Sequence, residues 1–475
     1  MKNKNTKKSW PDYRAVWRWH FYAGLFCIPF VILLSISGAI YLFKPQVEAW
    51  IDVPLDNLTP IAHRADADAQ IAAALNAVAG AQFIAYELPP ADNAAVRVFV
   101  KSEGATVRVY VHPQTLQILK TVREEDRFMQ VVRTIHGELL IGNVGSILVE
   151  LAASWAIVMV VSGIYLWWPR QVQGLAGLLF PRIGRGQRTF WRDIHAVTGI
   201  WISAFALVLL LSGLPWANVW GSYFKALRTL TGTAVAAQDW TVGRENADKQ
   251  SSGKTLEQGA SQEHVGHDHS AMQKSTNNFS TNYAQINRVV AVVSALQLAP
   301  PVRISPSTST ADLWAAKSDA QNRLLRADLL VNGASGEIVR RENFNQRHLI
   351  DRIIGTGVAA HEGQLFGWFN QLLGLFTALG LVLLSVSAVV LWWRRRATGL
   401  LGAPIPLQQP RFSFGLVVVV AGLAIYLPLF GASVAVVFVL EKFLFSQIPA
   451  VNRWLGLPEK IYKKTCEKNA APFPE

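Results

Sequence analysis

Two histidines stand at the entrances of two apolar runs that share one pattern. WRWHFYAGLFCIPFVILLSISG carries His20, and WRDIHAVTGIWISAFALVLLLSG carries His195, 175 positions later. In both runs a glycine follows four residues after the histidine, and a Ser-Gly pair closes the run. A repeated pattern of this length indicates that one helical unit is used twice.

Two further histidines mark a second repeated pattern. His136 lies in TIHGELLIG, which is followed by an apolar run and LWWPR. His361 lies in AHEGQLFG, which is followed by an apolar run and LWWRR, 225 positions later. Two helix types, each present twice and each with one histidine, predict an internal duplication.

Metal ligation is the chemistry that these histidines suggest. Neutral imidazole is the commonest metal ligand, and an ionisable group at the edge of a membrane bundle usually marks function. Two histidines that face each other across a helical bundle can bind haem iron axially, which predicts the pairs His20/His195 and His136/His361. Zinc or copper also binds histidine, but pairs without nearby Cys or carboxylate partners fit a two-ligand haem better. The chain has no CxxCH motif, so the haem would be non-covalent, b-type.

The alternative is that these histidines are interfacial anchors or packing residues, as a single histidine at a membrane interface usually is. Four of them at duplicated spacing favour ligation. Charged neighbours are candidate partners of the imidazoles or of haem propionates, and each is equally well explained as a topology or surface charge. These neighbours are Arg18, Arg192 and Asp193 on the inner side and Arg133 on the outer side. Glu150, near the outer end of the second span, is a candidate proton or ligand partner, and the alternative is a helix residue that faces water.

A separate His-rich segment, EHVGHDHSAM, contains His264, His267 and His269. Imidazoles this close together predict a site for Cu, Zn or Fe ions. The competing interpretation is a disordered polar loop, because the surrounding stretch at about 233–282 is rich in Ser, Gln, Asn and Gly.

Composition indicates the elements that position these residues. The chain has 475 residues, of which 51% are hydrophobic and 16% charged, and several apolar runs are long enough to cross hydrocarbon. The net charge of +13 gathers beside those runs rather than in a separate basic domain. This placement follows the positive-inside rule, puts the N-terminus in the cytoplasm, and argues against a nucleic-acid partner.

The predicted fold class is a membrane all-α bundle of duplicated two-helix units, with four core spans, a fifth span and two periplasmic α+β insert domains. The fifth apolar run is taken as one long span, and a hairpin at Pro428 and Gly431 is the alternative. The predicted organisation is a cytoplasmic head and span 1 at 1–43, a first periplasmic domain at 44–135, spans 2 and 3 with a basic loop at 136–214, a second periplasmic domain with the polar insert at 215–360, span 4 and a connector at 361–411, span 5 at 412–440, and a tail at 441–475.

The motifs H-x3-G … SG and H-x4-[IF]-G … LWWxR, joined by an outer segment with VYVHPQTLQIL, resemble the bacterial PepSY-associated transmembrane family over roughly 14–396. Members of that family include inner-membrane ferric-siderophore reductases. The resemblance implies PepSY-like insert domains and a four-helix core that holds two haems. It also implies electron transfer across the inner membrane to a ferric complex in the periplasm.

The resemblance therefore predicts an oxidoreductase of the ferric-chelate reductase type, with a ferric siderophore or another ferric chelate as substrate. No nucleotide-binding fingerprint is present, so the electron donor would be quinol or a separate cytoplasmic reductase. Two other functions stay open. One is a siderophore or metal permease without redox chemistry, because duplicated halves also suit transporters. The other is a non-enzymatic membrane protein whose PepSY domains bind or regulate a partner.

Overall fold

The computed structural model describes residues 13–59, 63–169, 174–233, 283, 285–307, 312–404 and 414–456. The chain forms two compact units, each built from separate stretches of sequence. The first unit comprises Met1–Leu33, Glu150–Leu207 and Leu379–Glu475, and the second comprises Leu34–Val149 and Val208–Ala378.

Four helices among the described residues are long and apolar enough to cross a membrane. They are α1 (Tyr13–Leu42), α5 (Gly142–Trp167), α6 (Gln187–Gly213) and α11 (Trp368–Arg395). These helices correspond to the four core spans predicted from the sequence. Their apolar side chains are largely exposed in the absence of lipid, which is the pattern expected of helices that a bilayer surrounds.

The fifth apolar run is not one long span, so that prediction was wrong. It forms two short helices, α12 (Phe414–Tyr426) and α13 (Pro428–Val439), which break at Leu427. Pro428 causes the break, because its ring disfavours helical backbone at the preceding residue and it cannot donate a backbone hydrogen bond. The run then ends in η5 (Leu440–Leu444), η6 (Phe445–Gln447) and α14 (Pro449–Leu455).

Both ends of this run return to the same place in the first unit. Arg18 donates hydrogen bonds to the carbonyl oxygen of Pro404, before the run, and to that of Gly456, after it. Between these ends, Trp155 of α5 donates to the Ser433 hydroxyl over 3.1 Å and packs edge-on against Phe430. The run is therefore a helical hairpin, the alternative that the Pro and Gly positions had suggested.

The second unit contains one eight-stranded antiparallel sheet of order β4-β3-β2-β1-β5-β6-β7-β8. The strands are β1 (Gln82–Glu87), β2 (Val96–Ser102), β3 (Ala105–Val111), β4 (Ile118–Arg123), β5 (Val302–Pro306), β6 (Leu313–Ser318), β7 (Ala327–Asn332) and β8 (Ile338–Asn343). The sequence predicted two insert domains. The structure joins both into this single sheet, because β1 pairs with β5 at Tyr86↔Ile304 and Glu87↔Arg303.

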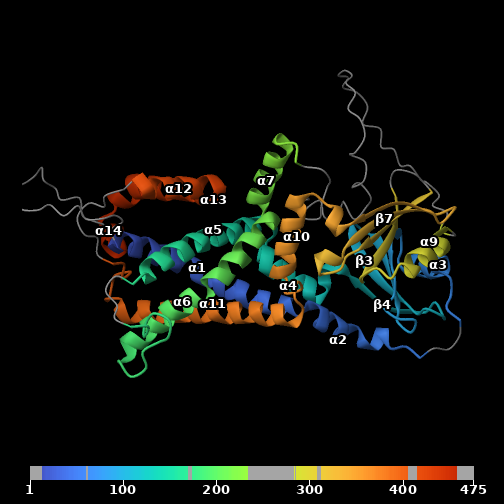
Figure 1. Ribbon diagram of the computed structural model, residues 1–475, viewed down its shortest axis with the longest axis horizontal. Helices are drawn as coiled ribbons and strands as arrows, with labels where there is room; N and C mark the ends of the chain where they lie inside the picture. Colours follow the sequence, from blue (N-terminus) through green and yellow to red (C-terminus); the bar gives the residue numbers. More distant parts are fainter. Residues whose placement is uncertain are drawn as a thin grey trace, which may run out of the picture. The chain divides into compact units, whose positions relative to one another are not determined.

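One face of the sheet is covered by α3 (Ala67–Ala77) and α9 (Gln285–Ala295), one helix from each half of the sheet (Figure 1). Alternate strand residues point to this face, as the two-residue period of a strand requires. They form a continuous apolar core with Ile71 and Ile286 of the two helices, both of which are fully buried. Trp314 is the largest fully buried side chain in this core.

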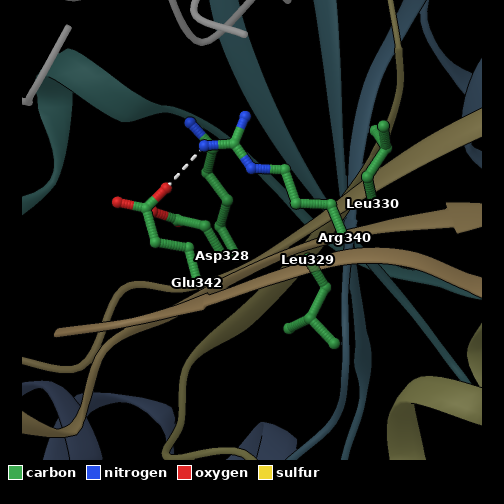
Figure 2. A pocket seen from close by; sticks show the side chains of 6 residues that line it. Asp328, Leu329, Leu330, Arg340 and Glu342 are labelled. Carbon is green, nitrogen blue, oxygen red and sulfur yellow. Dashed lines mark hydrogen bonds and ion pairs between the residues drawn. The ribbon is translucent and has the colours of Figure 1, made fainter. Parts of the chain in front are cut away.

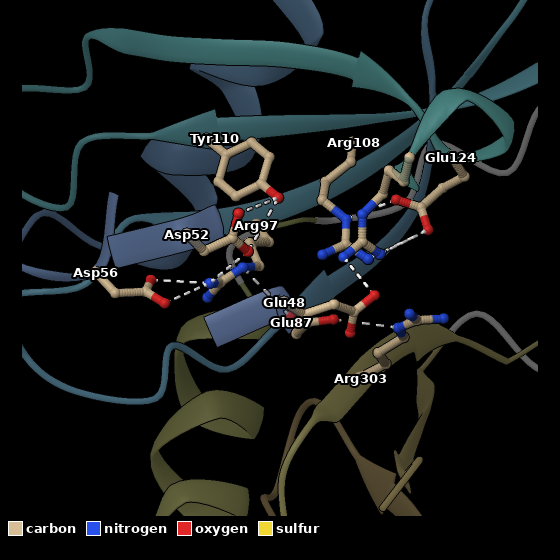
Figure 3. A network of polar contacts seen from close by, with 10 residues as sticks. Glu48, Asp52, Asp56, Glu87, Arg97, Arg108, Tyr110, Glu124 and Arg303 are labelled. Carbon is tan, nitrogen blue, oxygen red and sulfur yellow. Dashed lines mark hydrogen bonds and ion pairs between the residues drawn. The ribbon is translucent and has the colours of Figure 1, made fainter. Parts of the chain in front are cut away.

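The other face of β1–β4 carries charge and lies under α2 (Lys44–Asp56), which follows α1 in the chain. Arg97 is its centre, with ion pairs of 3.2 Å to Asp52 and 2.8 Å to Asp56 (Figure 3). Glu87 bonds to Arg303 of β5 over 3.3 Å, so the same network crosses the junction between the two halves of the sheet. Satisfied buried charges of this kind fix how α2 meets the sheet.

The corresponding face of β6–β8 has a shallow hollow lined by Lys317, Asp328, Leu330, Arg340 and Glu342 (Figure 2). Its charges neutralise each other, as the 2.8 Å Arg340–Glu342 ion pair illustrates, and no histidine lines it. The remaining elements are η1 (Glu124–Asp126), α4 (Phe128–Glu138), η2 (Leu214–Trp216), α7 (Asn218–Leu230), η3 (Arg323–Leu325), η4 (Phe344–Gln346) and α10 (Leu349–His361).

Candidate functional site

The first unit brings His20 of α1 and His195 of α6 together. Their ring centroids lie 6.5 Å apart, and the two ring planes are nearly perpendicular, at 88°. The sequence had placed both residues in one predicted pair. Because each stands near the start of a long apolar helix, the helices themselves position the two imidazoles.

The second unit brings His136 and His361 together in almost the same geometry. Their ring centroids lie 6.3 Å apart and their planes meet at 81°. The two residues form the pair that the sequence predicted, but they lie on other helices than predicted. His136 belongs to α4 and His361 ends α10, so neither lies on the spans α5 and α11 that follow.

Breaks with left-handed backbone separate these two helices from the spans. Leu139, after α4, and Gly142, at the start of α5, have φ of 52° and 60°. Gly363 and Gly367 have φ of 74° and 62° between α10 and α11. Left-handed residues end a helix, and glycine adopts this conformation without steric cost, which explains why the repeated motif has Gly after the histidine.

Each imidazole is held through its Nδ1 atom by a polar atom of a facing helix. Nδ1 of His20 lies 2.9 Å from the Ser162 hydroxyl oxygen, and Nδ1 of His195 lies 3.0 Å from that of Ser387. In the second unit, Ser37 and Ser212 take the same role, each 3.1 Å from Nδ1 of its histidine. These are His136 and His361, respectively.

The serines also determine which nitrogen carries the proton. Each of the four donates its hydroxyl hydrogen to a carbonyl of its own helix, so it accepts from the imidazole. We therefore assign the proton to Nδ1 in all four rings, which leaves the lone pair on Nε2. This is the arrangement in which a histidine binds a metal, with its other nitrogen donating to a neighbouring group. Burial lowers the pKa of His361 from its ordinary value of 6.5, which favours the neutral form.

The spacing of each pair fits one metal ion bound axially between two imidazoles. With about 2 Å from metal to nitrogen and about 1 Å from nitrogen to ring centre on either side, the centroids would lie roughly 6 Å apart. Both pairs match this value. Within the described ranges no three His, Cys, Asp or Glu side chains gather as a metal site, so each pair is a two-ligand arrangement. The donor set thus fits a haem and not a four-ligand zinc site.

Small residues next to the serines leave space for the imidazole rings. A Cβ on Gly38 would stand 3.1 Å from Cε1 of His136, and one on Gly213 would stand 3.4 Å from Cε1 of His361. Gly163, next to Ser162, has the same relation to His20 at 3.3 Å. Each histidine therefore packs against a serine that is followed by a small residue on the facing helix. The sequence contains this signal as the dipeptides Ser37-Gly38, Ser162-Gly163, Ser212-Gly213 and Ser387-Ala388, of which only the first and third belong to the repeated pattern described above.

Glycines also lie beside the histidines of the first unit. Gly199 follows His195 by one helical turn, and a Cβ there would meet only Leu384 Cδ1, at 4.0 Å. Gly24 follows His20 in the same way, with Met159 Cε at 3.4 Å. The helix backbone beside His195 is thus open at Gly199, as a flat macrocycle would require, whereas the Met159 side chain contacts the corresponding position, Gly24, beside His20.

The predicted charged partners on the inner side are engaged elsewhere. Arg18 is buried and bonds to Pro404 and Gly456, as described above. Asp193 is 1% exposed and pairs with Arg182 over 2.7 Å and with Arg192 over 2.9 Å. Its role is to anchor the segment before α6, and none of these contacts involves an imidazole.

The remaining predicted site residues are Arg133, Glu150 and the three histidines of the polar segment. Arg133 lies one turn before His136 in α4 and donates to Gln130 of its own helix over 3.4 Å. Glu150 is buried in α5, with 3% of its surface exposed. The residues His264, His267 and His269 lie outside the described residues.

Comparison with known proteins identifies a family. A family model described as the PepSY-associated TM region matches residues 17–395, most of the chain and all four histidines. No curated protein matches the sequence. With the four long apolar helices, this match establishes a membrane protein.

Proposed function

Because this chain belongs to the PepSY-associated TM region family, we propose that it is a two-haem b electron-transfer protein of a bacterial inner membrane. Its reaction is the reduction of a ferric siderophore or a related ferric complex on the periplasmic side. Quinol or a separate cytoplasmic reductase donates the electrons.

One observation carries the proposal: two histidine pairs with matching spacing, near-perpendicular rings and Nδ1 atoms held by serine. Packing histidines would have no reason to repeat all three features in two separate units. His20 and His195 are the ligands of the inner haem, and His136 and His361 those of the outer haem. A bound haem supplies a one-electron Fe(III)/Fe(II) couple at each pair.

The chain's own residues set the properties of these sites. The four serines fix the tautomer and orientation of the imidazoles, and hydrogen bonds of this kind raise ligand basicity and tune potential. Gly38, Gly163 and Gly213 bring the facing helix close enough for that bond to form. The apolar helices around each pair exclude water, which also shifts the potential.

The duplication supports the placement of one pair towards each side of the membrane. The first half of the sheet has the order helix (α3), four strands (β1–β4), short 3-10 helix (η1) and histidine-bearing helix (α4). The second half has the same order in α9, β5–β8, η4 and α10, with the additional 3-10 helix η3 between β6 and β7. Equivalent spans then share one orientation, so equivalent histidines lie at equal depth. The sheet belongs to the periplasmic side if the basic N-terminal head is cytoplasmic.

The chemistry of the substrate suits such a carrier. Fe(III) is a hard cation that oxygen chelators hold tightly, and one electron converts it to the more weakly bound Fe(II). Iron is thereby released without destruction of the chelator. The reaction requires a route for electrons through hydrocarbon, and two haems provide it.

The test is a visible spectrum of the purified protein, followed by haem quantification in two variants. A Soret band with sharp reduced α-bands is expected, with about two haems per chain. His195→Ala and His361→Ala should each remove about one equivalent, and the double variant both. A colourless, folded wild-type protein would refute the proposal and favour a permease or a partner-binding protein.

A further inference from the structure

Arg395, the last residue of α11, lies against the helix that carries His20. Its guanidinium carbon is 5.0 Å from the ring centre of Trp17 and 5.1 Å from that of Phe21. These two aromatic residues flank His20 on α1. Stacking against aromatic faces is a placement that arginine favours and that holds the guanidinium in a defined orientation.

A second arginine lies close to this one. Arg188, in the first turn of α6, is near enough for its positive charge to oppose that of Arg395. In the part of the chain that the structure describes, neither guanidinium forms an ion pair with a carboxylate. Two arginines within electrostatic range of each other, and without an acidic partner among the described residues, can both donate hydrogen bonds to one anion.

Both arginines are two helical turns from a residue of the His195 site. Arg188 precedes His195 by two helical turns on α6. Arg395 follows Ser387, which bonds to Nδ1 of His195, by two turns on α11. Residues two turns apart share a helix face. Arg188 lies at the start of α6 and Arg395 at the end of α11, so each lies on the same helix face as the His195 site and two turns closer to the helix end.

We propose that Arg395 and Arg188 form a binding site for carboxylates, and that this site binds the propionates of the inner haem. This inference rests on the proposed function and names the part of the inner site that the histidines do not provide. A carboxylate is costly in hydrocarbon, so the propionates of a bound haem would be more stable at the helix ends, where Arg395 and Arg188 would donate charge-assisted hydrogen bonds to them. Arg18 and Arg192, the sequence-based candidates, bond instead to backbone carbonyls and to Asp193.

The experiment compares Arg395→Gln and Arg188→Gln with Arg394→Gln, which removes the same charge from the neighbouring position. Haem loss is followed by transfer to an apo-globin, and the midpoint potential of each haem by spectropotentiometry. Wild type and variants are also reconstituted with haem and with haem dimethyl ester, which lacks the carboxylates. The inner haem is the one that His195→Ala removes.

Arg395→Gln and Arg188→Gln should each speed loss of the inner haem by about tenfold and lower its potential. The outer haem and the Arg394→Gln variant should behave as wild type. Wild type should prefer haem over its dimethyl ester at the inner site, and Arg395→Gln should abolish this preference. Arg395→Lys should restore the potential, because it restores the charge, but only part of the retention.

If both variants keep wild-type haem retention, potential and ester discrimination, the carboxylate site is wrong while the two-haem function stands. An effect of Arg395→Gln with haem and its ester alike would assign the arginines to another anion, such as a lipid phosphate, and would also overturn the proposal. Absence of haem from the wild type would instead overturn the function itself.

Discussion

Nδ1 of His195 lies 3.2 Å from the carbonyl oxygen of Leu384. A carbonyl only accepts, so the imidazole must donate from Nδ1, and its lone pair is on Nε2. This contact determines the tautomer without reference to any hydroxyl rotor. It also places the backbone carbonyl of Leu384, in α11, next to the His195 ring.

Removal of the serine partner should weaken the inner site without destroying it. In Ser387→Ala, His195 keeps its bond to Leu384, so haem affinity should fall by about tenfold, the low end for loss of such a partner. Ser385→Ala is the control, because Ser385 is also buried but bonds to Leu381 of its own helix. Haem titration of both variants measures the difference, and equal affinities would argue against the role of Ser387.

A larger side chain at Gly199 should exclude the inner haem. The protein has room for one there, since only Leu384 Cδ1 would lie within 4.0 Å of a Cβ. Gly199→Leu should therefore fold, and should melt like wild type when both proteins are free of haem, but it should bind about one haem equivalent less. Gly422→Leu on α12, where no atom lies within 4 Å of a Cβ, is the matched control. Full haem content in Gly199→Leu would mean that the space beside His195 is not a macrocycle site.

Loss of Arg97 should destabilise the sheet and α2 together. Arg97→Met leaves the carboxylates of Asp52 and Asp56 without their buried partner, at a cost of about 3–5 kcal/mol. Arg123→Met removes an exposed ion pair with Glu125 and should cost less than about 1 kcal/mol. Chemical denaturation in detergent, followed by tryptophan fluorescence, would measure both. A similar loss in the two variants would contradict the role given to the network.

Acid should weaken the protein partly through Glu124. Although burial raises the pKa of this carboxyl, Arg108 at 2.6 Å outweighs burial, so the pKa lies below its ordinary value of 4.5. Its stabilisation is complete above 4.5 and is lost as pH falls through the lowered value. Melting temperature against pH should therefore fall less steeply in that window for Glu124→Gln than for wild type. Glu125→Gln, at an exposed neighbour, should keep the wild-type slope.

The hairpin of α12 and α13 predicts that both of its ends face one side of the membrane. Single cysteines at Ala403 and Trp454, in a background without Cys27 and Cys466, should react with a membrane-impermeant thiol reagent from the same side. The contact between Leu401 N–H and the Trp454 carbonyl places these positions together. Labelling from opposite sides would contradict the hairpin and would mean that the fifth apolar run crosses the membrane once.

The sequence predicted the histidine pairs because two repeats marked them independently. It did not reveal that His136 and His361 belong to helices of their own, since positive φ at Leu139 is a property of the folded backbone. Hydropathy also cannot distinguish a span from a hairpin of the same length. Strand order is a third limit, because the alternation in β1 and β5 does not show that these two strands pair. In the sequence, Arg395 is one of several basic residues beside an apolar run, and only the structure shows its contact with Trp17.

The pairing of β1 with β5 has a consequence for biogenesis. In the order of synthesis, β1 precedes α5 and α6, and β5 follows both. The first half of the sheet therefore leaves the ribosome with an unpaired strand edge, which stays unpaired until α5, α6 and the second half of the sheet have been synthesised. During that interval an exposed edge can recruit a foreign strand. A chain truncated after α6 should accordingly depend on chaperones and be degraded, even with its first four strands intact.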